Sequence, residues 1–531
     1  MKVWDYIVIG AGSAGCVVAN RLSETGTKNV LLLEAGEKDN AIGLKVPSGI
    51  AFGKTMQNND WGYHSEPDPT RNNKVDHWLR GRVVGGSSSI NGTMYVRGNA
   101  ADYDRWASMG NYGWAAKDVM PLFQSLECSD KPDSSRGQNG PLSVKTAQGV
   151  HTLTDSFISA SRNVGWSFND DYNADSQEGV SYVQLTQRRG IRCSSADAFL
   201  KPVLHRKNLK LLTGSTIHKL IINKQTVSGV RYEKDGEVKD IYASRVVICA
   251  GAINSPKLLM LSGIGDAEEL SKLGIEVVLD QPNVGKNLRE HPLVNFAYKV
   301  KVPSYNTTEG FFQKFRFLTK YLLKGQGPLS SAFEATAFLK TRAEEPFPDI
   351  QLHFMPVGTA AYGSDDDSIL PFPAVTVLLN KSHPKSVGQI RLRSADPVEA
   401  PKIECKLLEN EEDLATLVRG SEIVQSIMTS SPIADLVEEE IRPGIAYSDR
   451  EAIAAYIKSH TDLAYHPVGT CRMGIDGEAV VTPELQVRGI DNLWVADASI
   501  MPDLISGNTN AVCMMIGEKL GRSLQEKDRS E

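Results

Sequence analysis

The six residues GAGSAG at positions 10–15 limit the fold of this chain more than any other feature. They follow a short apolar run at residues 6–9 and precede residues 16–22, whose composition suits a helix. A second apolar run, VLLL, follows at residues 30–33. Strand, glycine turn, helix and strand in this order predict a β-α-β unit, the element from which parallel α/β sheets are built.

The spacing of the glycines is the G-x-G-x-x-G fingerprint of dinucleotide-binding proteins. Gly10 permits the tight turn, Gly12 lets the backbone approach a pyrophosphate, and Gly15 lets helix and strand pack closely. Glu34 ends the second predicted strand, where a carboxylate accepts hydrogen bonds from an adenosine ribose and disfavours a 2′-phosphate. The stretch therefore predicts a bound dinucleotide other than NADP.

Two other interpretations of the same stretch stay open at this point. One is a glycine turn that binds nothing. The other is a nucleophile elbow, because the residues AGSAG at 11–15 come close to the pattern G-x-S-x-G. An elbow serine normally follows several strands, whereas Ser13 follows one, so the sequence favours the dinucleotide.

Composition sets limits on the class of protein. The 531 residues suffice for two or three folding units, and a net charge of -6 without a long basic run argues against nucleic acid as a partner. The seven cysteines are scattered and form no C-x-x-C, so we expect no disulfide framework, and a cytoplasmic location. The N-terminus does not resemble a signal peptide. No stretch approaches the roughly 18 apolar residues of a membrane span, which leaves peripheral contact with the inner membrane open.

The pattern of apolar residues changes along the chain. Residues 246–250, VVICA, suit a buried strand of the same α/β unit, whereas residues 375–379 look like a strand of a separate antiparallel region. A helical stretch follows at residues 411–428. The end of the chain returns to a strand at 493–497 and a helix near 511–524. We therefore expect two structural regions, the first of which is discontinuous.

Several separated motifs identify a family. A second glycine-serine loop, GRVVGGSSSIN, lies at 81–91, and GAINSPKLLMLSGIG lies at 251–265. With the opening fingerprint, VGKNL at 284–288, LAYHPVGTCRMG at 463–474 and NTN at 508–510, they closely resemble the glucose–methanol–choline (GMC) flavoprotein oxidoreductases. The resemblance runs almost end to end, and it is strongest to bacterial choline-dehydrogenase-like and alcohol-dehydrogenase-like members.

The resemblance implies FAD rather than NAD as the dinucleotide. It assigns Gly10, Gly12, Gly15 and Glu34 to the ADP half, Gly85, Gly86, Ser87 and Asn91 to the flavin and its phosphates, and Asp497 to the ribityl and pyrophosphate region. Members with a covalently attached flavin carry a histidine just before the Asn91 position. This chain has Ile90 there, so we expect non-covalent FAD.

The resemblance also implies an α/β architecture of two domains. A discontinuous, Rossmann-like FAD-binding domain is expected from residues 1–155, 195–295 and 457–531. An α+β substrate-binding domain with an antiparallel sheet is expected from residues 156–194 and 296–456.

His466 admits several roles when it is considered alone. A metal ligand needs partners, and Cys471 is accompanied by neither C-x-x-C nor H-E-x-x-H, so no metal is expected. Cys471 also lacks a context that would activate it as a nucleophile. A place in the core is the usual role of a single histidine. The resemblance instead assigns His466 as the catalytic histidine and Asn510 as the second member of a His/Asn pair.

These residue types suit the oxidation of a primary alcohol to an aldehyde. The reaction removes a hydride, which the flavin accepts at N5, and a hydroxyl proton, which a neutral imidazole can take as general base. Asn510 would donate its amide to the substrate oxygen. Tyr465 is expected in the pocket wall or the core. Glu334 lies where some relatives place a pocket acid, so it would bind a quaternary ammonium or form an ion pair within the domain.

The electron acceptor and two other functions stay open. A dehydrogenase with a quinone-like acceptor is favoured over an oxidase that uses O2. A flavoprotein lyase of the same fold would add to carbonyls without net redox. A flavin-binding protein without catalysis is the other alternative, and the presence of both His466 and Asn510 argues against it.

Overall fold

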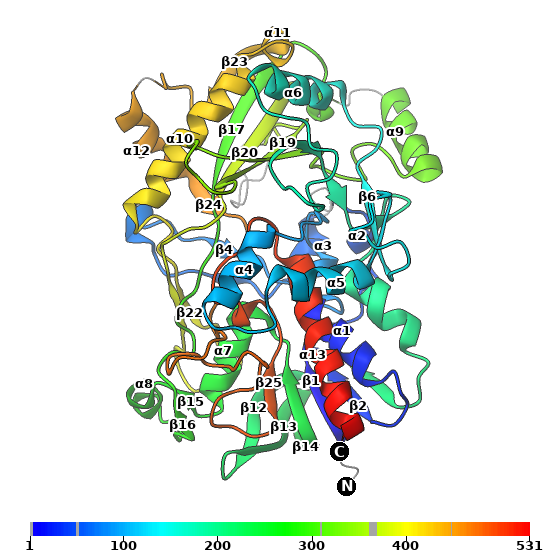
Figure 1. Cartoon of the computed structure of the whole chain (residues 1–531), viewed down its shortest axis with the longest axis vertical. Coiled ribbons are helices and arrows are strands. Elements are labelled where there is room, and N and C mark those ends of the chain that lie inside the picture. Colours follow the sequence, from blue (N-terminus) through cyan, green and yellow to red (C-terminus); the bar gives the residue numbers. More distant parts are fainter. Residues whose placement is uncertain (1–3, 49–52, 308–310, 360–368, 448, 531) are drawn as a thin grey trace.

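The structure is a computed structural model that describes residues 4–48, 53–307, 311–359, 369–447 and 449–530. Two seven-stranded sheets occupy the two ends of the elongated molecule (Figure 1). One is mostly parallel and the other is antiparallel. The expected α/β fold with a separate antiparallel sheet is therefore confirmed.

The first sheet contains the predicted β-α-β unit. Its parallel strands are, in order, β11 (Leu209–Leu212), β2 (Val30–Leu33), β1 (Trp4–Ile9), β14 (Glu237–Ile248) and β25 (Leu493–Val495). β13 (Thr226–Lys234) and β12 (Thr216–Asn223) continue it as antiparallel strands beyond β14. Every residue of β2 is buried, as expected for a parallel strand covered on both faces.

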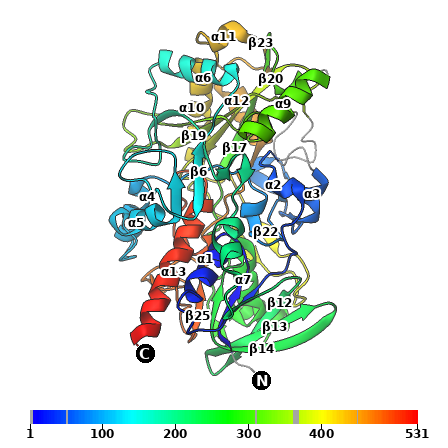
Figure 2. The ribbon, with the colours of Figure 1, turned by 90° about the vertical axis from the view of Figure 1, so that its right-hand side faces the viewer.

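Helices α1 (Ser13–Leu22) and α13 (Asn510–Ser530) lie side by side in both ribbon views (Figures 1 and 2). A Cβ at Gly517 would lie 2.6 Å from the carbonyl oxygen of Ala14, so glycine permits this close approach. α1 follows β1, and α7 (Gly251–Leu261) follows β14. Both helices therefore begin at the carboxyl edge of the parallel strands, where such sheets bind ligands.

The second sheet is built from distant parts of the chain. Its strands are, in order, β23 (Val437–Arg442), β17 (Pro292–Val300), β20 (Ala374–Lys381), β19 (Ile350–Met355), β18 (Ala335–Leu339) and β7 (Gly179–Tyr182), with β24 (Thr461–Leu463) also paired to β17. Helix α10 (Glu411–Met428), with the bounds that the sequence predicts, packs on β19 and β20. Asn410 caps this helix by accepting from the backbone N–H of Glu412.

Three elements bear on the expected domain boundaries. α6 (Thr152–Asn163) packs on β19, and β24 pairs with β17, which itself begins at Pro292. The sequence-based division cuts α6 and β17, and it assigns β24 to the FAD-binding domain. We propose boundaries at residues 151/152, 291/292 and 463/464 instead, so that each element stays with its sheet.

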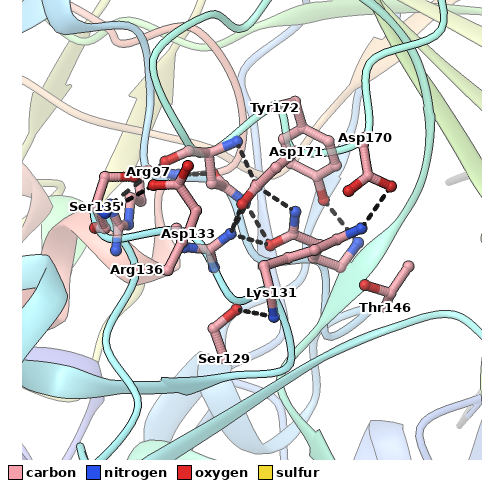
Figure 3. Close-up of polar contacts among 12 residues, drawn as sticks. Arg97, Ser129, Lys131, Asp133, Ser135, Arg136, Thr146, Asp170, Asp171 and Tyr172 are labelled. Carbon is pink, nitrogen blue, oxygen red and sulfur yellow. Dashed lines mark hydrogen bonds and ion pairs between the residues drawn. The ribbon is translucent and has the colours of Figure 1, made fainter.

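A buried ion network joins the two parts of the molecule (Figure 3). Arg136 donates to Glu127 over 2.7 Å and to Asp171 over 2.6 Å, and Arg97 donates to Glu127 over 2.6 Å. Asp171 lies on the segment that leads into β7 of the antiparallel sheet. Because removing one partner of a buried pair costs about 3–5 kcal/mol, the network fixes this segment.

The remaining elements are mostly short. The helices are α2 (Ile42–Lys45), α3 (Gly53–Asn58), α4 (Ala100–Ser108), α5 (Ala116–Leu126), α8 (Ala267–Lys272), α9 (Phe311–Lys324), α11 (Ile433–Leu436) and α12 (Arg450–His460). The strands are β3 (Tyr63–His64), β4 (His77–Trp78), β5 (Glu127–Ser129), β6 (Leu142–Thr146), β8 (Gln184–Leu185), β9 (Gln187–Arg188), β10 (Ile191–Arg192), β15 (Ile264–Gly265), β16 (Leu279–Asp280), β21 (Gln389–Arg391) and β22 (Lys402–Glu404). None of the described helices is long and apolar enough to cross a bilayer.

Candidate active site

One continuous cavity extends from the carboxyl edge of the parallel sheet to the antiparallel sheet. Gly10, Gly12 and Glu34 line one end, and His466 lines the other. The cavity thus brings the dinucleotide fingerprint and the predicted catalytic histidine into one site, although 432 residues separate Glu34 from His466.

The three fingerprint glycines differ in what surrounds them. Gly10 has a φ of +96°, and a Cβ there would lie 2.5 Å from the carbonyl oxygen of Cys249. A Cβ at Gly15 would lie 1.9 Å from the carbonyl oxygen of Gly10. Packing within the protein therefore explains why Gly10 and Gly15 are glycines. Gly12 lines the cavity, and a Cβ there would meet no described atom closer than 4.0 Å. The close approach of a ligand such as a pyrophosphate to the backbone explains why this residue is glycine.

Glu34 also fits its predicted place. Its side chain lines the cavity and accepts hydrogen bonds of 2.8 Å from the backbone N–H groups of Ala11 and Gly36. Burial raises the pKa of the Glu34 carboxyl to about 7, although these hydrogen bonds oppose the rise. Each carboxylate oxygen keeps a second lone pair for a ribose hydroxyl.

The second glycine-serine loop lies directly on the first. A Cβ at Gly86, whose φ is +54°, would lie 2.8 Å from the Cα of Gly12. Ser87, Ile90 and Asn91 line the cavity with Gly86. Gly85 does not line it, because its backbone N–H donates to the carbonyl oxygen of Ala11 and its own Cα is buried against Ser89. Gly85 therefore joins the two loops rather than lining the cofactor cavity.

Asp497 lines the cavity at the start of α7. One of its oxygens accepts from the backbone N–H of Gly251 over 2.8 Å and from the hydroxyl of Ser255 over 2.6 Å. The other accepts from the backbone N–H of Ser499 over 2.8 Å. The carboxylate therefore positions the N-terminus of α7, and its predicted contact with the cofactor stays a prediction.

His466 is buried at the far end of the cavity, on a loop with strained backbone. Tyr465 has a φ of +64°, lines the cavity as expected for a pocket wall, and its carbonyl oxygen accepts from Arg80 over 2.7 Å. The Nε2 atom of His466 lies 3.0 Å from Nδ2 of Asn508. Its Nδ1 atom lies 2.9 Å from Nδ1 of His291. The imidazole is thus held at both nitrogens.

The contacts of His291 determine which nitrogen of His466 carries the hydrogen. Nε2 of His291 contacts two carbonyl oxygens, those of Ser382 (2.9 Å) and Ile505 (3.1 Å), so it must be the protonated nitrogen. Burial lowers the pKa of His291 to about 3, which leaves Nδ1 as an acceptor. His466 must then donate from its own Nδ1. Its Nε2 keeps a lone pair, to which the amide of Asn508 donates.

Burial also sets the charge of the catalytic candidate. It lowers the pKa of His466 well below the ordinary 6.5, and the positive charges that His291, His353 and Arg80 carry when protonated lower it further. His466 is therefore neutral near pH 7, with its basic nitrogen turned to the cavity. This is the protonation state that a general base needs.

Glu290 supports this arrangement from behind. One of its oxygens accepts from the backbone N–H of His466 over 2.7 Å and from that of His291 over 2.9 Å. The other oxygen has no hydrogen-bond partner among the described residues, and burial raises the pKa of this carboxyl to about 8. Glu290 therefore fixes the two histidine loops to each other.

Asn510, the predicted partner of His466 in catalysis, lines the same cavity but does not contact His466 directly, and its catalytic role stays a prediction. Asn508 contacts His466, whereas Asn510 begins α13 and accepts a hydrogen bond of 2.7 Å from the hydroxyl of Ser13. The helix turns the Asn510 side chain towards α1. Sequence reasoning also missed Glu290 and His291, although only Arg289 separates them from the VGKNL motif.

Glu334 does not line the cavity, contrary to one sequence-based expectation. The chain is extended here, so Phe333 faces the cavity and Glu334 faces away from it. Its carboxyl accepts from the backbone N–H of His151 and the hydroxyls of Thr154 and Tyr305. Glu334 joins α6 to the sheet by hydrogen bonds and forms no ion pair with these partners.

A cavity that admits an extended dinucleotide and ends at a neutral, buried histidine defines a nucleotide-dependent oxidoreductase. Family profiles described as GMC oxidoreductase match residues 4–293 and 384–517. The chain belongs to the GMC oxidoreductase family.

Full-length relatives agree with this assignment. An alcohol dehydrogenase [acceptor] from Pseudomonas putida is 39% identical over 99% of this chain and 96% of its own length. An oxygen-dependent choline dehydrogenase from Sinorhizobium fredii is 40% identical over 97% and 94%. Among solved structures, pyridoxine 4-oxidase from Mesorbium loti has a TM-score of 0.89 at 30% identity, covering 98% of this chain and 99% of its own.

The flavin is supported by a second solved structure. A formate oxidase variant from Aspergillus oryzae, described by its FAD modification, has a TM-score of 0.91 at 25% identity and covers 100% of this chain and 99% of its own. The expectation of an FAD-dependent enzyme that oxidises an alcohol is confirmed by family and relatives together.

Proposed function

We propose that this chain oxidises an uncharged primary alcohol with an apolar body, and that Nε2 of His466 takes the hydroxyl proton. The observation that carries the proposal is the fixed tautomer of His466, which turns a lone pair into the cavity. Bound FAD would be held by Gly12, Glu34 and the loop at 86–91, and it would supply the acceptor for the hydride.

The residues at the base explain how the proton can leave the substrate. A substrate hydroxyl replaces the hydrogen bond between Asn508 and His466 with two others. Its oxygen accepts from the amide of Asn508, and its hydrogen points to Nε2 of His466. The Asn508 amide stabilises the negative charge that develops on this oxygen. His291 accepts from Nδ1 of His466 throughout and keeps the ring oriented.

The wall next to His466 is apolar. Met94, Leu293, Phe333 and Leu378 line it and belong to one buried hydrophobic cluster. His353 is the polar exception: Nε2 bonds to Asn380, and Nδ1 has no hydrogen-bond partner among the described residues. Burial lowers the pKa of His353 to about 4, so this ring is neutral and offers one hydrogen bond to a substrate.

The charges of the lining residues favour an uncharged substrate over a cation. Among the described residues of the cavity wall, the acids are Glu34 and Asp497, both beside the dinucleotide fingerprint or α7. Glu334, the candidate for binding a quaternary ammonium, faces away and is satisfied by three donors. Burying an unpaired ammonium against the aliphatic side chains of Leu293 and Leu378 would be unfavourable.

The test compares choline with 3,3-dimethyl-1-butanol, its uncharged isostere, in anaerobic stopped-flow flavin reduction. The two alcohols differ only in carbon replacing the quaternary nitrogen. We expect the neutral alcohol to reduce the flavin at least about 10²-fold more efficiently at low concentration, because no acid compensates the buried charge.

4-tert-Butylbenzyl alcohol and 4-(trimethylammonio)benzyl alcohol, which differ only in carbon replacing the quaternary nitrogen, serve as a second matched pair. Equal or better reduction by the cation in both pairs would overturn the uncharged substrate and leave the alcohol chemistry intact. A flavin that none of the alcohols reduces would overturn the proposed oxidation and favour the lyase. Mixing the reduced enzyme with oxygen or with a soluble quinone then separates an oxidase from the dehydrogenase that we favour.

Three finer points belong to the same proposal. Ile90 lines the cavity at the place where covalent members carry a histidine, which supports non-covalent FAD. The dehydrogenase, with a quinone-like acceptor, is supported by the relative from Pseudomonas putida, which is named an alcohol dehydrogenase [acceptor]. The name of the Sinorhizobium fredii relative, an oxygen-dependent choline dehydrogenase, favours O2 instead. A cytoplasmic location is supported by the seven cysteines, none of which is paired.

The pH dependence of flavin reduction tests the charge of His466. The neutral ring is the reactive form, and its pKa is lowered below 6.5, so acidification to pH 6.5 leaves this form dominant. We expect the reduction rate constant to be level from pH 8 to 6.5 and to fall only at lower pH. Ultrafiltration at each pH checks that FAD stays bound. A half-maximal rate above pH 6.5 would contradict the lowered pKa.

A further inference from the structure

Helix α9 lies at the edge of the molecule (Figure 2), and it exposes several large apolar side chains. Leu322 is 71% exposed and Leu323 is 84% exposed, and Leu318 is 44% exposed one turn earlier. Leu318 and Leu322 share one face because they are four residues apart. An exposed apolar row of this size is unusual on a surface that faces only water.

The opposite face of α9 holds the helix to the body of the protein. The ring of Phe317 meets the ring of Tyr305 edge-on, with centroids 5.9 Å apart. The hydroxyl of Tyr321 donates to the carbonyl oxygen of Gly190 over 3.2 Å. The leucine row is therefore turned outward by contacts on the other side.

Basic residues surround this apolar row. The helix sequence, FFQKFRFLTKYLLK, contains four basic residues and no acidic residue, on a chain whose net charge is -6. Arg316 and Lys324 are exposed. The turn between β9 and β10 adds exposed Arg188 and Arg189 beside α9, since a Cβ at Gly190 would lie 2.5 Å from Cα of Gly325.

We propose that α9 and the β9–β10 turn bind the surface of a lipid bilayer that contains anionic lipids. Leucine side chains would enter the boundary between headgroups and acyl chains, and the basic residues would lie at the level of the phosphates. Apolar residues flanked by Lys and Arg are the composition of helices that lie in this interface. A two-fold contact between copies through this face would bring two basic helices together, so the charge of α9 favours anionic lipid over such a pairing.

The same contacts connect the membrane surface to the cavity wall. Tyr305, which packs on Phe317 of α9, donates to Glu334 over 2.8 Å. Glu334 directly precedes β18 and follows Phe333, which lines the cavity. Docking through α9 would therefore place the apolar end of the cavity on the membrane side, where apolar alcohols concentrate. The membrane contact itself does not depend on the proposed substrate.

Vesicle sedimentation of the FAD-loaded protein tests this surface. We expect the protein to bind vesicles of phosphatidylcholine with 30% phosphatidylglycerol and to bind pure phosphatidylcholine weakly. The double variant L322Q/L323Q should bind at least about 10-fold less, because it loses the apolar contact. The double variant R316Q/K324Q should lose most of the preference for phosphatidylglycerol.

The matched control is V238Q/V398Q, which removes two exposed valines (54% and 68% exposed) away from α9. It should bind as the wild type does. All variants should keep bound FAD and the rate of flavin reduction, since none of these residues touches the cavity. Failure of the wild type to bind, or equal binding by L322Q/L323Q, would overturn the proposal. A wild-type dimer that L322Q/L323Q dissociates would assign the surface to a second copy and also overturn it.

Discussion

Replacing His466 with alanine should slow alcohol-driven flavin reduction by a factor on the order of 10²–10⁴. The variant loses the one lone pair that the contacts of His291 and Asn508 turn towards the substrate hydroxyl. The alcohol must then lose its proton to water. Anaerobic stopped-flow absorbance at saturating alcohol measures this rate constant directly.

Two controls separate chemistry from folding. His205→Ala removes an exposed histidine and should leave the rate unchanged. The FAD content of His466→Ala, measured by absorbance, should match that of the wild type, because His466 lies at the end of the cavity away from the fingerprint. A His466→Ala protein that reduces its flavin at the wild-type rate would refute the assignment of the base.

Replacing Asn508 with alanine should slow flavin reduction by about 10²–10³-fold, the usual cost of one donor to a developing oxyanion. Replacing Asn510 should have a much smaller effect on the FAD-saturated protein, because its amide oxygen accepts from Ser13 rather than contacting His466. The two variants remove the same side chain from positions two residues apart. The same stopped-flow measurement compares them.

The ratio of the flavin-reduction rate constants of these two variants decides which asparagine assists the reaction. A larger loss in Asn510→Ala than in Asn508→Ala would restore the pairing inferred from the sequence. Asn508→Asp is a useful third variant, because an acid at this position cannot stabilise negative charge on the substrate oxygen. It should be at least as slow as Asn508→Ala.

The sequence predicts the parallel sheet well because its signals are local. The fingerprint glycines lie within one turn, and two of them are required by contacts to Cys249 and to Gly10 itself. The helix at 411–428 is likewise predicted from its own residues, and the structure adds that Asn410 caps it. The residue pattern indicates a separate antiparallel region near residues 375–379, but antiparallel partners are not local, so it does not reveal that β7, β17 and β24 join this sheet.

The pair of histidines could not be predicted from spacing. His291 and His466 are 175 residues apart, and they meet because Pro292 of β17 pairs with Leu463 of β24. The choice between Asn508 and Asn510 also needs the structure. Both asparagines belong to the same NTN motif and line the cavity, but only Asn508 contacts His466, whereas Asn510 begins α13 and accepts a hydrogen bond from Ser13.

Glu334 shows how one position in an extended segment changes a functional interpretation. The resemblance places an acid near the pocket, and alternation of side chains decides which of two neighbours faces it. Phe333 does, so the cavity gains an aromatic ring and loses a charge. The sequence does not reveal which of these two neighbours faces the cavity unless the pairing of β18 is known.

The residues that we propose to recognise the alcohol and the residue that we propose to take its proton lie on different kinds of backbone. Leu293, His353 and Leu378 project from β17, β19 and β20, whose ladder hydrogen bonds hold the main chain whatever the side chain. His466 and Asn508 lie on loops fixed by Glu290 and His291. Substitutions on the strands can therefore change substrate preference during evolution while the proton-accepting group keeps its geometry, so a single ancestral chemistry can serve descendants with different alcohols.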